Sequence, residues 1–253
     1  MNIFDIQGKT ALITGSGEGL GYILSKGLAK AGATVILNGR NEKKLKNTAK
    51  EFTGLGYQVH YYVFDITKSS EVHWAVKKIE QAVGPIDILI NNAGIQIRKP
   101  LEDFSEKNWN EIINTNLTGA FIVSKAVVQG MIKRQAGKII NICSLMSEVG
   151  RPTIAPYAAA KGGLKMLTRA MTVEWAKYNI QVNAIGPGYF ITDMTKSLAE
   201  DPNFDNWIKR RTPAGRWGKP DELIGTTLYL ASAASNFVNG QIIYVDGGIL
   251  AAL

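Results

Sequence analysis

Short apolar runs alternate with longer segments of helical periodicity along the whole chain. The apolar runs, each bounded by turn residues, lie at residues 10–14, 34–38, 58–64, 86–94, 139–143, 180–185 and 241–245. Apolar residues at helical spacing occupy residues 19–30, 41–52, 69–83, 105–134, 157–178 and 221–231, and Ser69 is the expected N-cap of the third helix. Strands that alternate with helices at this spacing form a parallel sheet with helices on both faces. The pattern therefore predicts an α/β protein with a seven-stranded parallel sheet.

The first apolar run ends in a glycine-rich turn that leads directly into the first helix. In this strand–turn–helix context, backbone N–H groups and the helix N-terminus can hold a pyrophosphate. Right-handed crossovers and the position of this turn imply a single-domain, doubly wound Rossmann fold with strand order 3-2-1-4-5-6-7. The residues expected to bind the nucleotide phosphates here are Gly15, Ser16, Gly17, Glu18, Gly19, Leu20 and Gly21.

The end of the second strand bears on the choice of nucleotide. An acidic residue there would accept hydrogen bonds from the ribose hydroxyls of NAD, whereas an arginine suits the 2′-phosphate of NADP. This chain has the neutral Asn38 and the cationic Arg40, which favours NADP because a guanidinium matches phosphate geometry. Glu18 acts in the opposite direction, since a carboxylate in the glycine turn would lie near the same phosphate. We predict NADP as the preferred cofactor and keep NAD as the alternative.

Polar residues also follow the third and fourth strands. Asp65, Asn92 and Gly94 fall at the carboxyl ends of these strands, where ligands bind in a parallel sheet. Asn92 has two interpretations that remain open, a cofactor contact and a structural amide that ties neighbouring strands. Further along, Asn116 interrupts a helical pattern and competes for backbone hydrogen bonds, which predicts a local kink and an ordered water.

The segment from Ser144 to Lys161 carries the candidate chemistry. Tyr157 and Lys161 lie four residues apart in a helical pattern, so their side chains share one face. A nearby ammonium favours the phenolate, which predicts a tyrosine pKa well below its usual value of about 10, and such a phenol can exchange protons with a substrate oxygen. Ser144 can place its hydroxyl beside the phenol. The alternative is a half-buried tyrosine beside a solvated lysine, without a catalytic role.

Composition and charge narrow the classes of function. The chain has 253 residues, of which 45% are hydrophobic and 20% charged, as in ordinary globular proteins. The formal net charge of +8 comes from scattered Lys and Arg without a basic tail, which favours anionic small ligands over nucleic acid. One cysteine and two histidines give no disulfide and no metal-ligand cluster. No apolar run is long enough for a membrane span, and the N-terminus is too polar for a signal peptide, which predicts a cytoplasmic protein.

The stretch at about residues 189–220 is the least regular part of the pattern. It is rich in polar, aromatic and basic side chains and shows no strong periodicity. We expect it to form a mobile substrate flap over the site rather than a second domain.

Taken together, the motifs resemble those of the short-chain dehydrogenase/reductase family. Residues 14–21 are similar to its TGxxxGxG turn, residues 91–94 to its NNAG motif, and residues 187–192 to its PG and threonine signature. The family's catalytic tetrad is matched by Asn116, Ser144, Tyr157 and Lys161. The resemblance covers nearly the whole chain in the right order, and jointly these motifs are specific.

The resemblance implies a role for each of these residues. Tyr157 is the general acid/base, Lys161 lowers its pKa and binds the nicotinamide ribose, and Ser144 stabilises the substrate oxygen. Asn116 anchors a water that links Lys161 to solvent, and the hydride comes from the cofactor. The further cofactor contacts that the family implies are Asp65, Ile66, Asn92, Ala93, Gly94, Pro187, Gly188, Phe190 and Thr192.

Within the family, the gluconate 5-dehydrogenases are the most similar subgroup. The similarity lies in residues 91–98, 141–151, 185–190 and 209–218, and it implies a sugar-acid substrate whose carboxylate needs a cation. The substrate contacts expected on this basis are Arg98, Ser144, Glu148, Arg151 and Tyr157. The family also implies a homotetramer, with helices around residues 101–134 and 157–178 at one interface.

Two other functions remain open at this point. A 3-oxoacyl-[acyl-carrier-protein] reductase shares the fold and the tetrad, and its acidic carrier protein would suit the basic surface. A catalytically idle protein that senses nucleotides would use the same fold for binding alone, although the complete tetrad argues against it.

Overall fold

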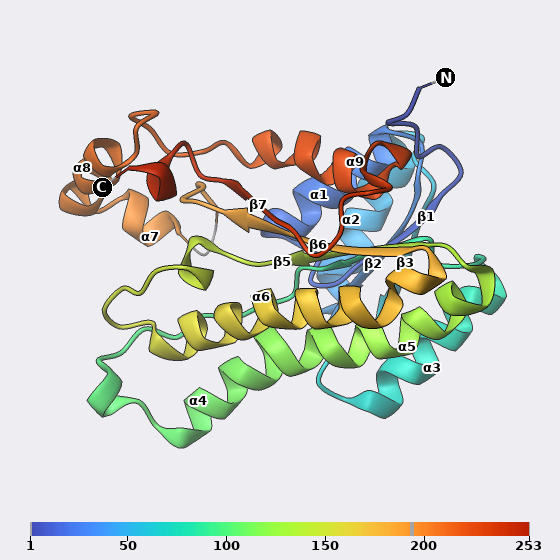
Figure 1. Cartoon of the computed structure of the whole chain (residues 1–253), viewed down its shortest axis with the longest axis horizontal. Helices are drawn as coiled ribbons and strands as arrows, with labels where there is room; N and C mark the ends of the chain where they lie inside the picture. The colour runs from blue at the N-terminus through green and yellow to red at the C-terminus, as the bar shows by residue number, and fades with distance from the viewer. Residues whose placement is uncertain (1, 193–194, 253) are drawn as a thin grey trace.

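One parallel sheet of seven strands forms the centre of the molecule. The computed structural model describes residues 2–192 and 195–252, and its strands follow the order β3-β2-β1-β4-β5-β6-β7 (Figure 1). The strands are β1 (Thr10–Ile13), β2 (Thr34–Gly39), β3 (Val59–Val63), β4 (Ile88–Asn91), β5 (Gly137–Ile142), β6 (Ile180–Pro187) and β7 (Ile242–Val245). The predicted fold class, a doubly wound sheet with this strand order, is confirmed.

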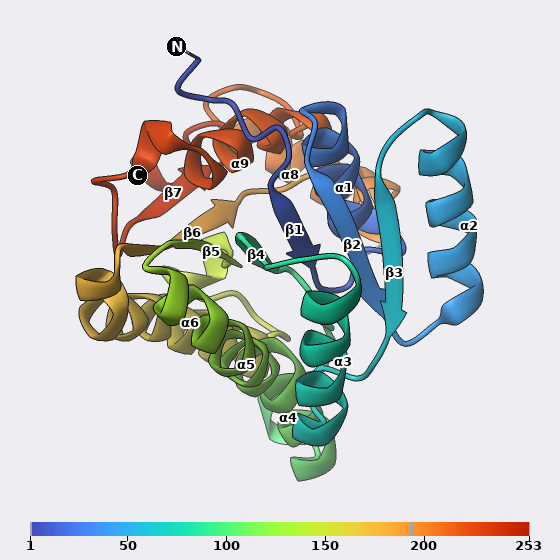
Figure 2. The same ribbon diagram turned by 90° about the vertical axis from the view of Figure 1, so that its right-hand side faces the viewer.

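Helices cover both faces of the sheet. The α-helices are α1 (Gly19–Lys30), α2 (Glu42–Gly54), α3 (Ser69–Ala82), α4 (Glu106–Ile113), α5 (Gly119–Arg134), α6 (Ala155–Trp175), α7 (Lys196–Ala199), α8 (Pro202–Arg211) and α9 (Ile224–Ala231). Figure 1 shows α1 and α9 above the sheet and α3 to α6 below it, and Figure 2 shows α2 beside the edge strand β3. The layers are those of an open α/β sheet.

The strands are apolar on both sides because both faces are covered. In β1, Ala11 and Ile13 pack into the core under α1, whereas Leu12 between them packs into the core on the opposite face. All three side chains are fully buried. The period of two along a strand thus divides one apolar run between two cores, and the central strands are fixed in register by burial on both faces.

One of the predicted local features is wrong, and one helix was not foreseen. Ser69 is the first residue of α3 rather than its N-cap, and Lys68 precedes the helix without a side-chain cap. The Ser69 hydroxyl lies 3.3 Å from His73 Nδ1, one turn further along. The stretch 189–220 also contains a regular helix, α8, whose N-cap Asp201 accepts a hydrogen bond from the N–H of Asn203 at 2.9 Å. Asp201 followed by Pro202 is an ordinary helix start signal, and the sequence interpretation overlooked it.

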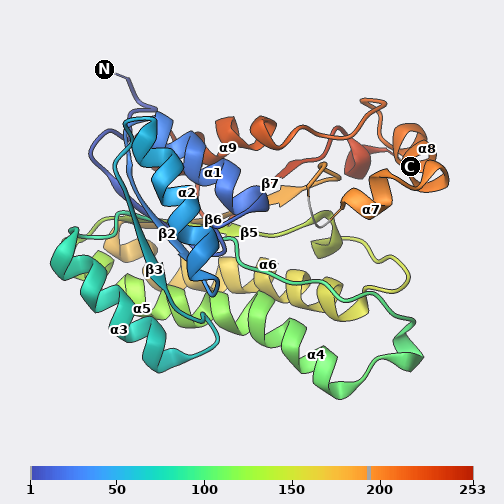
Figure 3. The ribbon, with the colours of Figure 1, turned by 180° about the vertical axis from the view of Figure 1, so that it is seen from behind.

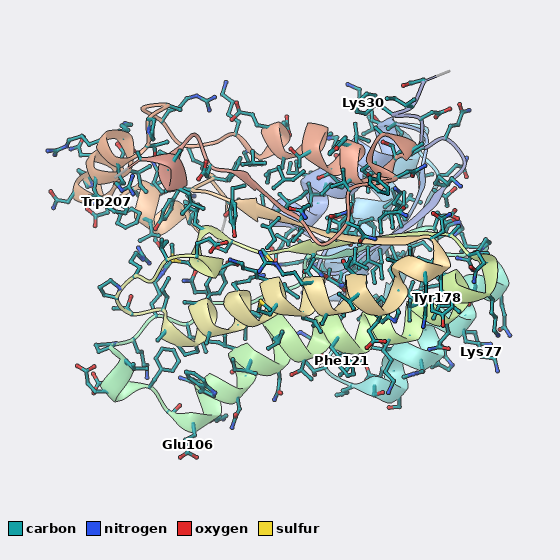
Figure 4. All side chains as sticks on the ribbon, viewed as in Figure 1. Lys30, Lys77, Glu106, Phe121, Tyr178 and Trp207 are labelled. Carbon is teal, nitrogen blue, oxygen red and sulfur yellow. The ribbon has the colours of Figure 1, made fainter. Side chains whose placement is uncertain are left out.

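The expected flap is packed around an aromatic cluster. The ring of Tyr189 meets those of Phe204, Trp207 and Trp217 edge-on, with centroid separations of 5.7 to 6.1 Å, and Trp217 Nε1 donates to Asp205 Oδ1 at 2.8 Å. Figure 3 shows α7 and α8 together at one end of the molecule, and Figure 4 shows Trp207 at the outer side of this region. Residues 193 and 194 of the expected flap lie outside the described residues.

Among residues 2–192 and 195–252, no helix combines the length and the apolar character that a membrane crossing needs.

Candidate active site

A cavity of about 840 Å³ runs along the carboxyl ends of the strands. Its wall begins at the glycine turn after β1, passes the ends of β2, β3 and β4, and reaches Ser144, Tyr157 and Lys161. Cavities of this size hold cofactors and drug-sized ligands, and this position is where doubly wound sheets bind them. The fold therefore brings the predicted nucleotide and catalytic residues to one space.

The glycine turn needs glycine because the backbone is crowded. Gly15 has φ +64°, and a Cβ on it would lie 2.8 Å from Ala93 Cα; a Cβ on Gly21 would lie 2.3 Å from the carbonyl oxygen of Gly15. Gly17, Glu18, Gly19 and Leu20 line the cavity beside Gly15. Ser16 and Gly21 are buried behind the turn and do not line it.

The Ser16 side chain holds the turn against the second strand. Its Oγ donates to the carbonyl of Ile13 at 2.9 Å and accepts from the N–H of Asn38 at the same distance. Asn38 in turn donates from Nδ2 to the carbonyl of Phe64 at 3.0 Å, which ties β2 to the end of β3. Asn38 lines the cavity, but its side-chain amide is hydrogen-bonded to the main chain at the end of β3.

Asp65 and Ile66 both line the adenosine end of the cavity. The Asp65 carboxylate accepts from the N–H and the hydroxyl of Thr67, at 2.9 and 2.8 Å. Burial raises the pKa of Asp65, but these hydrogen bonds and the nearby Arg40 outweigh it, so the pKa lies below its ordinary value. Asp65 is therefore an anion at neutral pH.

Glu18 is paired with a lysine that the sequence interpretation missed. Lys44 Nζ lies 2.5 Å from Glu18 Oε2, and both residues line the cavity together with Arg40. Lys44 stands one turn into α2, whose N-cap Asn41 accepts from the Lys44 N–H at 3.0 Å. The signal that could have found Lys44 is its place in the first turn of the helix after Arg40, because that turn faces the glycine turn.

The end of β4 combines structural and lining roles. Asn92 Nδ2 donates to the carbonyls of Thr14 and Gly15, at 2.9 and 3.0 Å, so its amide ties two strand ends together. Ala93 and Gly94 line the cavity next to it. Of the two interpretations of Asn92, the structural one describes its side chain, while the residue also forms part of the wall.

The nucleotide-binding residues fit a dinucleotide. A Cβ at Gly15 or Gly21 would close the space behind the turn, cations are present at Arg40 and Lys44, and the same cavity continues to Tyr157. The cations at one end suit the phosphate-bearing adenosine of a dinucleotide, and Tyr157 at the other end suits the neighbourhood of its nicotinamide ring.

Lys161 is buried beside Tyr157. Its side chain is 4% exposed, Nζ donates to the carbonyl of Ile142 at 2.5 Å, and Nζ lies 5.7 Å from the centre of the Tyr157 ring. Burial lowers the pKa of Lys161 to about 8. The i, i+4 spacing does place both side chains on the cavity side of α6, as predicted.

The predicted fall in the pKa of Tyr157 is wrong for this structure. Burial raises the pKa of Tyr157 above its ordinary value, and the hydrogen bond with the Ser144 side chain offsets this only in part. Burial of the phenol decides the direction, and the Lys161 ammonium bonds to the Ile142 carbonyl rather than to the phenol. Tyr157 is therefore a neutral phenol at pH 7, the form that donates a proton.

Asn116 lies in a π-helical turn, Asn114–Thr118, between α4 and α5. Its Oδ1 accepts from the N–H of Ile95 at 2.8 Å, and its Nδ2 donates to the carbonyl of Ile95 at 2.9 Å. The predicted interruption is thus present. Each polar atom of the amide makes one main-chain bond and keeps one further hydrogen-bonding position, so the water expected at Asn116 stays a prediction.

The nicotinamide-end residues Pro187, Gly188, Phe190 and Thr192 all line the cavity. A Cβ on Gly188 would lie 2.7 Å from Asp246 Cα, and Phe190 pairs with Gly218 in an isolated parallel bridge. Gly188 thus packs against the segment that follows β7, and the bridge joins the start of the flap to its end.

The expected substrate residues Arg98, Glu148 and Arg151 do not line this cavity. Glu148 accepts from Lys165 Nζ at 2.5 Å and from the Tyr244 hydroxyl at 2.6 Å. Burial and the charge of Arg151 lower the pKa of Arg98, and the Arg151 guanidinium stacks 5.1 Å from the Phe204 ring centre. The structure thus groups the two arginines with the aromatic cluster of the flap and places Glu148 in a separate ion pair.

Ser147 is a further site residue that the sequence interpretation missed. Its Oγ accepts from the N–H of Ser144 at 3.3 Å and donates to the carbonyl of Lys161 at 3.0 Å. The spacing Ser144-x-x-Ser147 forms a capping box, and that pattern could have indicated it.

Comparison with known proteins assigns the class. The family model described as short chain dehydrogenase matches residues 9–203, more than half of the chain. The chain therefore belongs to the short-chain dehydrogenase family and is an oxidoreductase that acts on CH–OH groups with a nicotinamide cofactor.

Individual relatives are similar over the full length. The chain is 51% identical to the 5-keto-D-gluconate 5-reductase of Escherichia coli (strain K12), with 100% of this chain and 99% of the relative covered. It is 52% identical to the 2-dehydro-3-deoxy-D-gluconate 5-dehydrogenase of Formosa agariphila, covering 100% and 97%. The crystal structure of a gluconate 5-dehydrogenase from Burkholderia cenocepacia J2315 in complex with NADP and tartrate has a TM-score of 0.98 and 50% identity, with 100% of this chain and 99% of that chain covered.

Proposed function

We propose that this protein is an NADP(H)-dependent oxidoreductase that interconverts a secondary alcohol and a ketone on a sugar acid of the gluconate/5-ketogluconate type. The observation that carries the proposal is one continuous cavity that joins Arg40 at one end to Ser144 and Tyr157 at the other. Full-length sequence identity of 51% to a 5-keto-D-gluconate 5-reductase supports the substrate class.

Tyr157 acts as the general acid in the direction of reduction. Its raised pKa keeps the phenol protonated at neutral pH, and it donates that proton to the oxygen of the ketone as the carbonyl becomes an alcohol. The Ser144 hydroxyl is within hydrogen-bonding reach of the phenol, and when substrate is bound its single proton turns to the same ketone oxygen and disperses the charge that develops on it. The nicotinamide cofactor, held along the cavity, supplies the hydride when bound.

Lys161 stabilises the phenolate that remains after the proton leaves. Its ammonium lies 5.7 Å from the ring and is held by the Ile142 carbonyl, and a buried cation at this distance favours the anion of its neighbour. Because the pKa of Lys161 is about 8, this stabilisation is present below that pH and is lost above it.

The guanidinium groups of Arg98 and Arg151 are the candidates for the substrate carboxylate. Burial, and after it the charge of Arg151, lower the pKa of Arg98, so the two guanidinium groups lie near one another. Both arginines also lower the pKa of Tyr189, which burial raises. Arginine pairs bind carboxylates with charge-assisted hydrogen bonds, and this supports a sugar acid over a neutral sugar.

The proposal is tested by oxidation of NADPH with 5-ketogluconate. We expect turnover by the wild type, and a loss of about 10²–10⁴-fold in kcat for Tyr157→Phe with an unchanged Kd for NADPH measured by fluorescence. Reduction should slow above about pH 8 as Lys161 loses its proton. Full activity of the Tyr157→Phe variant would refute the assignment of the general acid.

A second substrate is supported by the 52% identity to a 2-dehydro-3-deoxy-D-gluconate 5-dehydrogenase. Both substrates are sugar acids, so the same arginines serve either. A panel of gluconate, 2-dehydro-3-deoxygluconate and an acetoacetyl thioester, each with NAD(H) and NADP(H), separates the candidates by kcat/KM. Turnover of the thioester alone would instead identify a 3-oxoacyl reductase.

A further inference from the structure

The adenosine end of the cavity carries more carboxylates than cations. Among the described residues that line this end, the cations are Arg40 and Lys44, and the carboxylates are Glu18, Glu42 and Asp65. A dianionic 2′-phosphate placed here needs more positive charge than Arg40 alone offers.

Lys44 is placed to offer that charge. Its side chain projects from the first turn of α2 toward the glycine turn, where Nζ bonds Glu18 Oε2 at 2.5 Å. The turn and the helix are in close contact, since a Cβ on Gly17 would lie 3.4 Å from Lys44 Cβ. Asn41 caps the helix through the Lys44 N–H, so the backbone at Lys44 is fixed while its side chain is not.

The partner of Lys44 can be exchanged at little cost. The side chains of Lys44 and Glu18 are 49% and 57% exposed, and exposed ion pairs contribute little to stability. A phosphate is a stronger partner for an ammonium than a single solvated carboxylate because it carries more charge. The Glu18 carboxylate, once released, would be left to accept hydrogen bonds from ribose hydroxyls.

We propose that Lys44 is the second cation for the 2′-phosphate of NADP, held ready by Glu18, and that this pair sets how strongly the chain prefers NADP to NAD. The inference rests on the proposed use of NADP and extends it to named residues. Glu18 keeps Lys44 in the cavity but competes with the phosphate for it. The same carboxylate suits the free ribose hydroxyls of NAD. The Lys44–Glu18 pair can therefore bind either nucleotide, but with different affinities.

The test uses binding rather than turnover. Calorimetric titration of the full chain with adenosine 2′,5′-bisphosphate and with 5′-AMP isolates the 2′-phosphate, because the two probes differ in that group alone. For Lys44→Ala we expect the Kd of the bisphosphate to rise about tenfold, the size of one charge-assisted hydrogen bond, with the Kd of 5′-AMP unchanged within about twofold. For Glu18→Gln the bisphosphate should bind a few times more tightly.

Two further variants make the result specific. Lys46→Ala removes an exposed lysine from the same helix that does not line the cavity, and it should bind both probes like the wild type. The double variant Glu18→Gln, Lys44→Ala should bind the bisphosphate better than Lys44→Ala alone, because the repelling carboxylate is gone. Equal effects of Lys44→Ala on both probes, or none on either, would overturn the inference.

The two proposals fail in different ways. Wild-type turnover of 5-ketogluconate with NADPH, together with an unaltered bisphosphate affinity in Lys44→Ala, would reject the role of Lys44 and leave the proposed function intact. Absence of any turnover of sugar acids would reject the proposed substrate, while the titration would still report on Lys44.

Discussion

Ser147 joins the two parts of the catalytic site with one hydroxyl. It accepts from the main chain of Ser144, at the end of β5, and donates to the main chain of Lys161, in the middle of α6. The Ser144 loop and the helix that carries Tyr157 are therefore held at a fixed separation by a side chain that touches neither reacting group. Ser147 is a positioning residue, and its loss should affect the chemical step more than cofactor binding.

We expect Ser147→Ala to lower kcat by about tenfold, because small displacements of catalytic groups are costly, while the Kd for NADPH changes less than twofold. The pH at which reduction slows should also shift, since the position of Lys161 sets its pKa. Ser147→Thr keeps the hydroxyl and should restore most of the activity. A purely structural role would show itself as a lower Tm with kcat and pH profile unchanged, which thermal melts and steady-state kinetics distinguish.

The π-helical turn between α4 and α5 places the Asn116 side chain in the interior. Asn116 is 1% exposed and makes both of its side-chain hydrogen bonds to the main chain of Ile95. The loop after β4 is thereby attached to the helix layer, and Gly94 lies so close that a Cβ there would be 3.3 Å from Asn116 Oδ1. π-Turns inside helices occur often at functional sites, and here the turn fixes one wall of the cavity.

Asn116→Ala should reduce the free energy of unfolding by about 1–3 kcal/mol, because it leaves the N–H and carbonyl of Ile95 without partners. Urea unfolding monitored by circular dichroism measures the change. The matched control is Asn114→Ala in the same π-turn, where the side chain is exposed and the expected change is below about 0.5 kcal/mol. Equal destabilisation by both variants would show that the turn, rather than the Asn116 bonds, carries the effect.

The strands were predictable from the sequence because burial on both faces makes them continuous apolar runs. Helix ends were less predictable. Ser69 satisfies the N-cap pattern, yet it is the first residue of α3 and its hydroxyl lies near His73. Tertiary electrostatics could not be read from spacing at all. The i, i+4 pair places Tyr157 and Lys161 together, but only the fold shows that Ile142 takes the ammonium and that burial raises the pKa of the phenol.

At the scale of the whole molecule, the helix layer formed by α4, α5 and α6 carries exposed apolar side chains. On α5, Phe121 is 44% exposed, and on α6, Met166 and Val173 are 57% and 82% exposed; Phe121 is labelled in Figure 4. A contiguous patch of exposed apolar side chains marks a protein–protein interface, and α5 and α6 contact each other in this layer. We propose that this layer is one contact of a homotetramer, at the helices that the family resemblance indicates.

Light scattering after size exclusion should give a mass of about 110 kDa, four chains of 27.6 kDa. Val173→Lys places a charge in the proposed contact, where burial without a partner is unfavourable, so the mass should fall to that of a smaller assembly. Leu55→Lys alters another exposed apolar residue, which is 51% exposed at the C-cap of α2, outside this layer, and it should leave the mass unchanged. A wild-type mass of 27.6 kDa would reject the tetramer, and a tetramer insensitive to Val173→Lys would move the contact elsewhere on the surface.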